Sequence, residues 1–532
     1  MLKGAGQRSS AILGRGSEGV FTKLLVANRG EIALRVMRTC REMGIAPVAV
    51  YSDVDRNALH VRYADEAYLL GPAPPRESYL NIPRIIELAR RCGAQAIHPG
   101  YGFLSENADF AQACRDAGIA FVGPPPEAMR LLGDKVAARR RIRESNVPVI
   151  PGVDAVVDHK AATAAAKKVG YPVLIKAAAG GGGKGIRLVR NKAEMAEALH
   201  VASSEAASAF GDRGVYVEKF MEPVRHIEVQ VIADQHGHAV ALGERECSIQ
   251  RRHQKLVEES PSVAVDRVLR ERLLAAAVAA AEAAGYQNAG TVEFLMDSDG
   301  NFYFLEVNAR LQVEHPVTEL VTGIDLVADQ IRVAAGEPLS YRQEDITLEG
   351  WALECRIAAE DPFNNFLPSL GRVDYVHEPS GPGIRVDSAL FDGAELPYHY
   401  DPMVAKVITW GRDRNESLQR MRRALEEFVV VGIQTNIPFH LQLLDDPRFV
   451  RGQIHTRFLE EEFTMGATDG HDEEQVALMA AALLCHLKRR QPASPAASAA
   501  GERSGWRAAG RALVLQGRDW ATRANRWGRS TS

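Results

Sequence analysis

The segment TVEFLMDSDGNFYFLEVNAR, residues 291–310, carries the pattern that decides the fold. Two apolar runs flank Asp299-Gly300, a dipeptide typical of a two-residue hairpin turn. Counting back symmetrically from this turn places Glu293 opposite Glu306, with Asn308 on the same face. Facing carboxylates repel each other, and a divalent cation relieves that repulsion. The three oxygen-bearing side chains therefore predict an Mg²⁺ or Mn²⁺ site, with a solvated acidic face as the alternative.

The residues that follow this hairpin, Arg310 to Glu314, continue the line of polar groups. If the backbone stays extended, Arg310, Gln312 and Glu314 share one side. A guanidinium binds a planar oxyanion through paired donors, and a neighbouring carboxylate serves as a general base. The segment predicts a site for a small anion, with a surface ion pair as the alternative.

A glycine run lies upstream, where strand-like YPVLIK at residues 171–176 leads into Gly180–Gly183, Lys184 and Gly185. The run matches G-x-G-x-x-G, but a strand-like segment follows it where a dinucleotide site needs a helix. A P-loop is excluded because Lys184 is not followed by Ser or Thr. We expect a hairpin whose glycine flap closes over nucleotide phosphates, with Lys176 at its base; a flexible surface loop is the alternative.

Another polar segment, CSIQRRHQK at residues 247–255, gathers polar groups too densely for a core strand. A solvated basic loop is its plain interpretation.

The N-terminal part alternates strand-like and helix-like patterns. LLVA at 24–27 leads through 28–31 into a helical pattern, and PVAVYS and AQAIHPG follow as further strands. This alternation predicts a parallel sheet covered by helices. Ligands of such sheets bind beyond the carboxyl ends of the strands, which is where residues 28–31 and 98–106 fall.

Composition excludes several classes of function. Of 532 residues, 46% are hydrophobic and 25% charged, and a net charge of −4 argues against a nucleic-acid or anionic-membrane binder. No apolar run reaches the roughly 20 residues of a membrane helix. Six scattered cysteines without a CxxC pair predict reduced thiols and a cytoplasmic location. We expect residues 1–20 to form a disordered extension, with a transit peptide as the alternative.

The motifs, taken in order, resemble those of the ATP-grasp biotin carboxylases from about residue 21 to residue 465. The resemblance rests on LLVANRGEIALRV, HPGYGFLSENADFA, GDKVAAR, KAAAGGGGKG, ERECSIQRRHQK, EVNARLQVEHPVTE and ECRIAAEDP. Ala309 departs from the Thr that is frequent there. A carbamoyl-phosphate-type ligase shares the nucleotide and metal groups, but RLQVEHPVTE and Arg356 argue against it. A non-catalytic scaffold subunit is the other alternative.

The resemblance implies a role for each matching position. Metal would bind Glu293, Glu306 and Asn308. Bicarbonate would bind Lys255, Arg310, Gln312 and Val313, and Glu314 would deprotonate it. Biotin would lie at Tyr101, Gly102 and Arg356, and the catalytic residues would be Glu314, Arg356, Lys255 and Arg310. ATP would contact Lys135, Lys176, Gly180, Gly181, Gly182, Gly183, Glu218, Lys219, Phe220, His226, Gln250 and His253.

The resemblance also implies a mixed α/β and α+β multidomain fold. Pro124–Pro126 cannot continue a strand, and beyond Gly350 β-rich segments end in the helical pattern SLQRMRRALEEFVVVG. We expect a disordered extension over 1–20, an N-terminal parallel α/β domain over 21–134, and an ATP-grasp domain over 135–345 with a mobile glycine-rich lid at about 150–220. A β-rich biotin carboxylase C-terminal domain over 346–463 and a helical, basic tail over 464–532 would follow.

The expected cofactors are ATP and two Mg²⁺ or Mn²⁺ ions, with biotin as a carrier-bound substrate. No methionine here precedes a lysine, so the Ala-Met-Lys-Met type of biotin acceptor is absent from this sequence. The expected partners are a biotin carboxyl carrier protein, a carboxyltransferase subunit and a second copy of the chain. After residue 485, ten Lys and Arg stand against two acidic residues, and the Trp506 region resembles the start of a segment that contacts the carboxyltransferase in acyl-CoA carboxylases. We expect this tail to dock on a partner; a disordered relic is the alternative.

Overall fold

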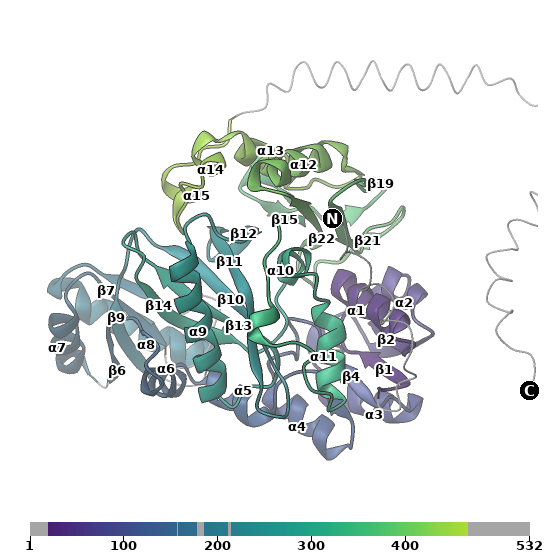
Figure 1. Cartoon of the computed structure of the whole chain (residues 1–532), viewed down its shortest axis with the longest axis horizontal. Helices are drawn as coiled ribbons and strands as arrows, with labels where there is room; N and C mark the ends of the chain where they lie inside the picture. Colours follow the sequence, from purple (N-terminus) through teal and green to yellow (C-terminus); the bar gives the residue numbers. More distant parts are fainter. Residues whose placement is uncertain (1–19, 157, 178–185, 211–213, 467–532) are drawn as a thin grey trace, which may run out of the picture. The chain divides into compact units, whose positions relative to one another are not determined.

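The computed structural model describes residues 20–466 apart from 157, 178–185 and 211–213 (Figure 1). The glycine run, almost all of the predicted N-terminal extension and nearly the whole tail therefore lie outside the described residues.

The N-terminal part is a five-stranded parallel sheet, as predicted. Its strands, in spatial order, are β3 (Glu66–Gly71), β2 (Ala46–Ser52), β1 (Lys23–Val26), β4 (Ala96–His98) and β5 (Ala120–Phe121). Its helices are α1 (Gly30–Glu42), α2 (Leu59–Tyr63), α3 (Ile82–Cys92) and α4 (Ala108–Asp116). In β1, Leu24 and Val26 pack in one core with α1, whereas Leu25 packs in another with α3 and α4. Burial on both faces explains why this strand is an unbroken apolar run.

An eight-stranded antiparallel sheet, called the central sheet below, is built from strands between residues 225 and 411 (Figure 1). Its strands, in spatial order, are β14 (Phe302–Asn308), β13 (Asn288–Met296), β10 (Arg225–Ala233), β11 (Ala239–Arg251), β12 (Gln254–Ser260), β15 (Trp351–Ala358), β22 (Met403–Gly411) and β20 (Ile384–Ser388). Helices α5 (Pro126–Gly133), α6 (Lys135–Glu144), α9 (Arg267–Ala283), α10 (His315–Thr322) and α11 (Leu326–Ala334) accompany it. Because β12 pairs with β15, the sheet runs unbroken across the predicted boundary at 345/346.

The hairpin of β13 and β14 confirms the predicted pairing of Glu293 with Glu306, but the predicted two-residue turn is wrong. Asp297 N–H donates to the Asn301 carbonyl at 2.9 Å, so the loop has three residues and ends on Gly300 at φ +77°. This shifts the register by one residue. A β-bulge at Leu305 places one extra residue on β14 and shifts the register back by one, so that Glu293 faces Glu306.

The segment predicted to be too polar for a core strand is a core strand. Residues 247–250 belong to the 13-residue strand β11 and are buried, and only Arg252 and His253 form the exposed turn to β12. The solvated-loop interpretation is wrong because the polar side chains here contact buried partners of the neighbouring strands.

A separate four-stranded sheet carries the predicted glycine hairpin. Its strands are β6 (Gly152–Val156), β9 (Val215–Lys219), β7 (Val173–Ala177) and β8 (Arg187–Val189), and its helices are α7 (His159–Val169) and α8 (Met195–Phe210). Strands β7 and β8 pair antiparallel, which confirms that a strand and not a helix follows the glycines.

The C-terminal part adds helices and three short ribbons beyond β22. The helices are α12 (Arg414–Glu427), α13 (Ile437–Asp445), α14 (Pro447–Val450) and α15 (Phe458–Glu461). The ribbons pair β16 (Glu360–Asp361) with β17 (Leu367–Pro368), β18 (Gly371–Arg372) with β21 (Glu395–Leu396), and β19 (Tyr375–His377) with β23 (Val429–Val431). The predicted closing helix is therefore too long: it ends at Glu427, and the β-branched run after it pairs with β19. In the described part of the chain, no helix is long and apolar enough to span a bilayer.

Candidate active site

A buried cluster of ion pairs lies on one face of the central sheet, around Lys255 of β12. Its ammonium contacts Glu228 at 2.5 Å, Glu293 at 2.8 Å and Glu314 at 2.7 Å. Burial opposes the charged form, but the three carboxylates together raise the pKa of Lys255 well above its ordinary value. The ammonium therefore stays charged and can meet an anion.

A row of three glutamates crosses three neighbouring strands beside this lysine. Glu228 of β10 is the cross-strand partner of Glu293 on β13, which in turn faces Glu306 on β14. Asn308 donates to Glu293 at 2.8 Å, which confirms that it shares their face. Lys135 at the start of α6 contacts Glu306 at 3.1 Å. The row becomes more exposed from Glu228, which is fully buried, to Glu306, whose side chain is 39% exposed.

These oxygens fit a hard divalent cation. Glu293 and Glu306 face each other, and Asn308 adds an amide oxygen, so the donor set is one that Mg²⁺ or Mn²⁺ prefers. Burial would raise the pKa of Glu293, but Lys255 and His226, whose Nε2 lies 3.1 Å from it, lower that pKa below its ordinary value. The carboxylate is thus ionised, as a metal ligand must be.

Glu314 occupies the N-cap position of α10. The condition of an extended backbone over residues 310–314 is not met, because the chain turns before the helix begins at His315. The turn still gathers the expected groups. Glu314 is held between Lys255 and Arg356, the latter at 2.8 Å. Burial favours the protonated acid, but these two cations hold the pKa of Glu314 well below its ordinary value. Glu314 is therefore ionised although it is fully buried.

Arg310 lies beside this cluster. Its guanidinium donates to Gln312 at 3.0 Å, to Asn308 at 3.3 Å and to Glu106 at 3.0 Å. Glu106 belongs to the predicted ligand edge of the N-terminal sheet, and it also accepts the N–H of Ala309 at 3.0 Å. Through Glu106, the ligand edge of the N-terminal sheet thus holds Ala309 and Arg310, where the predicted anion-binding segment begins.

Arg356 of β15 completes the cluster. Its Nε donates to Glu258 at 2.6 Å, so both of its ends are paired with buried carboxylates. Burial raises the pKa of Glu258 to about 7, although Arg356 opposes the shift. Near the site, Asn28 donates to the carbonyls of Pro99 and Tyr101 at 2.7 Å each. The loop that carries Tyr101 and Gly102, the latter at φ +69°, is held by these two bonds.

The predicted ATP contacts are only partly brought together. His226 lies 3.2 Å from Gln250 and borders the glutamate row. Lys176 is paired with Glu218 in the four-stranded sheet, and Lys219 donates to the carbonyl of Gly170 at 2.9 Å. Phe220 follows β9, and His253 is exposed on the β11–β12 turn. The flap glycines lie outside the described residues.

Sequence reasoning missed two buried residues of the site, Glu228 and Arg245. Arg245 is fully buried and contacts Glu228 at 2.6 Å, with Gln230, Thr318 and Thr291 as its neutral acceptors. The available signal was Glu228 itself, an acidic residue inside the apolar run IEVQVIA, since buried charges are rare unless they are paired.

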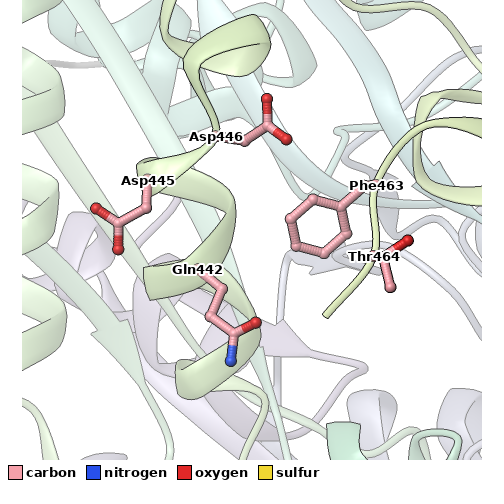
Figure 2. A pocket seen from close by; sticks show the side chains of 5 residues that line it. All are labelled: Gln442, Asp445, Asp446, Phe463 and Thr464. Carbon is pink, nitrogen blue, oxygen red and sulfur yellow. The ribbon is translucent and has the colours of Figure 1, made fainter. Parts of the chain in front are cut away.

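A shallow pocket of about 260 Å³ lies elsewhere, between α13 and the segment after α15 (Figure 2). It is lined by Gln442, Asp445, Asp446, Phe463 and Thr464. Asp445 points away from the Phe463 ring in this view and is paired with Arg422, and Asp446 is paired with Arg448 at 2.6 Å. Both aspartates are paired with arginines, and the buried cluster of ionisable groups around Lys255 lies elsewhere. This pocket is therefore not the active site.

Three protein-family models match consecutive parts of the chain. The biotin carboxylase N-terminal domain matches residues 20–129, the carbamoyl-phosphate synthase L chain ATP-binding domain matches 134–342, and the biotin carboxylase C-terminal domain matches 354–461. Biotin carboxylase 1 of Bacillus subtilis is 53% identical over 450 residues, which are 84% of this chain and 100% of that protein. The chain belongs to the biotin carboxylase family. It is an ATP-dependent enzyme that carboxylates biotin, and the flanking models argue against a carbamoyl-phosphate-type ligase.

Other relatives are named for different carboxylases. A pyruvate carboxylase subunit of Methanothermobacter thermautotrophicus is 53% identical over 83% of this chain and 90% of that protein. The human mitochondrial propionyl-CoA carboxylase alpha chain is 51% identical over 85% of this chain but 62% of that longer protein.

Solved structures match the fold closely. A Campylobacter jejuni biotin carboxylase in a β,γ-ATP complex has a TM-score of 0.81 and 48% identity, over 82% of this chain and 98% of that one. The biotin carboxylase domain dimer of Hydrogenobacter thermophilus 2-oxoglutarate carboxylase, in complex with MgADP, ADP and bicarbonate, has a TM-score of 0.80 and 47% identity, over 84% and 100%.

Proposed function

We propose that this biotin carboxylase carboxylates the biotin of a separate carrier protein. This step is the first half-reaction of an acyl-CoA carboxylase of the acetyl-CoA or propionyl-CoA type. The observation that carries the chemistry is Glu314, ionised and buried between Lys255 and Arg356. A carboxylate between two cations is suited to take a proton from an anion that those cations bind.

The residues divide by substrate. Lys255, Arg310, Gln312 and the Val313 backbone bind bicarbonate; Tyr101, Gly102 and Arg356 receive the ureido ring of biotin. The ATP contacts are those that the sequence predicts, with Lys135, Lys176 and the flap glycines on the phosphates. Glu293, Glu306 and Asn308 would hold Mg²⁺ or Mn²⁺ at two sites, and the metals would supply charge neutralisation between the phosphates of ATP.

The reaction runs in three steps. Glu314 takes the proton of bicarbonate, and a bicarbonate oxygen forms a bond to the γ-phosphorus while the bond to ADP breaks, which yields carboxyphosphate and ADP. Carboxyphosphate then splits into CO₂ and phosphate. Phosphate takes the ureido N–H proton, the nitrogen forms its bond to CO₂, and Arg356 stabilises the negative oxygen that develops on the ring. Burial of the cluster keeps water from the unstable intermediate.

A test of the activity uses ADP release by the purified protein, with bicarbonate and free biotin each added or withheld. Release that needs both substrates supports the proposal. Release that is indifferent to biotin, or absent under all conditions, would contradict it and favour a non-catalytic scaffold role.

The final acceptor is a separate part of the proposal. The Trp506 region and the similarity to a propionyl-CoA carboxylase alpha chain support an acyl-CoA carboxylase. The similarity to a pyruvate carboxylase subunit favours pyruvate as the second candidate. Copurification of the carboxyltransferase partner, followed by assays of that complex with acetyl-CoA, propionyl-CoA and pyruvate, distinguishes them.

The proposed assembly contains the carrier protein, the carboxyltransferase subunit and two copies of this chain. A relative crystallised as a biotin carboxylase domain dimer supports the second copy. We also propose a cytoplasmic location, which the five free, buried cysteines of the described chain suit. Light scattering of the purified chain and cell fractionation test these two points.

A further inference from the structure

A fully buried lysine lies behind the proposed bicarbonate segment. Lys406 is on β22, where its cross-strand neighbours are Arg356 on β15 and Asp387 on β20. Its side chain is 0% exposed, and its ammonium donates to the carbonyl of Val313 at 2.9 Å. The mechanism above gives this lysine no task, although burying an ammonium is costly unless it is paired.

The partners of Lys406 come from four elements of the fold. Glu31 in the first turn of α1 lies 3.4 Å from the ammonium, Asp387 lies 3.8 Å from it, and the Tyr101 ring centroid lies 5.8 Å away. At 3.4 Å the contact with Glu31 is an ion pair and not a hydrogen bond, since both Glu31 oxygens lack a hydrogen-bond donor. The carbonyl of Val313 is therefore the one close hydrogen-bond acceptor of this ammonium among the described residues.

The neighbouring peptide group is fixed from the same side. Nδ1 of His315 lies 2.8 Å from the carbonyl of Gln312. Burial lowers the pKa of His315 well below its ordinary value, so the ring is neutral, and this contact requires the proton on Nδ1. Two successive carbonyls, those of Gln312 and Val313, thus accept hydrogen bonds from buried donors.

Fixing these carbonyls fixes the amides as well. The cis peptide bonds of the described chain lie elsewhere, and in a trans peptide the N–H points opposite to the C=O of the same group. The N–H groups of Val313 and Glu314 are therefore turned away from His315 and Lys406. In the described part of the chain neither N–H has a hydrogen-bond acceptor, and both lie at the N-terminus of α10, where an anion is favoured.

We propose that Lys406 is a positioning residue for bicarbonate: it holds the Val313 carbonyl from behind and so keeps the backbone amides of the 312–314 turn directed at the anion. The inference rests on the proposed function, because it takes bicarbonate as the ligand of this turn. Glu31 and Asp387 hold the ammonium in place, and through Glu31 the helix α1 of the parallel sheet supports the substrate turn.

The test is the variant Lys406→Met, which keeps the length of the stem and removes the charged donor. We expect the KM for bicarbonate to rise about tenfold or more, since a hydrogen bond to a charged group contributes about 1.5–3 kcal/mol. The KM for ATP should stay the same. A purely structural role would instead lower kcat in proportion to the folded fraction and leave both KM values unchanged, which would overturn the proposal.

The matched control is Arg385→Met, which removes a half-buried partner of Asp387, at 2.8 Å, without touching Val313. It should leave the KM for bicarbonate unchanged. If Lys406→Met does not fold, the pair Glu31→Gln/Lys406→Met removes both charges together and is measured against Glu31→Gln alone. Insolubility of this pair too would overturn the proposal. Failure of the proposed function is recognised separately, because the unmodified protein would then show no bicarbonate-dependent ADP release.

Discussion

Lys255 and Glu314 contact each other at 2.7 Å, and each is also held by another buried partner of opposite charge. Glu293 holds the lysine, and Arg356 holds the glutamate. Because every charge is paired before substrate arrives, bicarbonate must exchange one of these contacts when it binds. The cluster is a preorganised site whose charges already stand where the substrates need them.

The variant Glu314→Gln should lower bicarbonate-dependent ADP release by about 10²–10⁴-fold, the usual contribution of a general base. The substitution keeps the shape of the side chain and removes the oxygen that accepts the proton. The matched control is Glu259→Gln on β12, an equally buried carboxylate that is paired with Arg414 at 2.7 Å outside the cluster. Equal rates for the two variants would contradict the role of Glu314.

Substitutions at the two ends of the glutamate row should differ in their effect on stability, although both should reduce activity. Glu228→Gln leaves the buried Arg245 without its carboxylate, so the free energy of unfolding should fall by about 3–5 kcal/mol. Glu306→Gln removes a carboxylate whose partner Lys135 is partly exposed, and the fall should be at most about 1 kcal/mol.

Both of these variants should lose activity, because Glu306 is a proposed metal ligand and Glu228 is the cross-strand neighbour of the proposed ligand Glu293. Urea unfolding and ADP release measure the two properties. A large loss of stability in Glu306→Gln would argue against this assignment.

Glu31 predicts a dependence of stability on pH. Burial raises the pKa of Glu31 from 4.5 to about 7, although Lys406 opposes the shift. The folded state therefore binds this proton more tightly than the unfolded state. The resulting stabilisation is fully present below pH 4.5 and is lost as the pH rises through about 7.

Glu31→Gln cannot titrate and should lack this slope. Unfolding of both proteins across this range, with the difference plotted against pH, measures it. A flat difference would show that Glu31 titrates at its ordinary pKa.

The metal site predicts that nucleotide and cation bind together. The carboxylate oxygens of Glu293 are already in contact with Lys255, His226 and Asn308. One carboxylate oxygen of Glu306 is in contact with Lys135. A cation alone must displace these donors, whereas the phosphates of ADP offer the lysines another anion.

Mg²⁺ alone should therefore raise the thermal midpoint much less than MgADP does, and ADP with a chelator should also have little effect. A full shift with Mg²⁺ alone would contradict this cooperation. The metal-ligand variant Glu306→Gln is the control, and its MgADP shift should be smaller.

The basic tail predicts a contact with a partner. Ten Lys and Arg after residue 485, against two acidic residues, favour an acidic surface on another protein of the assembly. Deleting residues 491–532 should weaken assembly with the carboxyltransferase and spare carboxylation of free biotin. Sedimentation of the mixed proteins measures assembly. If the full-length and the truncated chain form the same amount of complex, the contact is refuted.

Local patterns in the sequence were enough to predict much of this protein. The alternation of strand-like and helix-like patterns indicated the parallel sheet. Counting back from the turn paired Glu293 with Glu306 correctly because the extra loop residue and the bulge at Leu305 cancel. The order of motifs identified the family. These features depend on near neighbours in the chain, which is why spacing alone reveals them.

Only the tertiary structure decided which charges are buried together. Lys255 and Glu293 lie far apart in the sequence, and they meet beside Glu228 because β12, β13 and β10 belong to one sheet. The polar segment 247–250 became a core strand for the same reason: partners on neighbouring strands satisfy side chains that would otherwise need water. A buried charge is tolerated only with its partner, and that partner is fixed by the fold and not by sequence spacing.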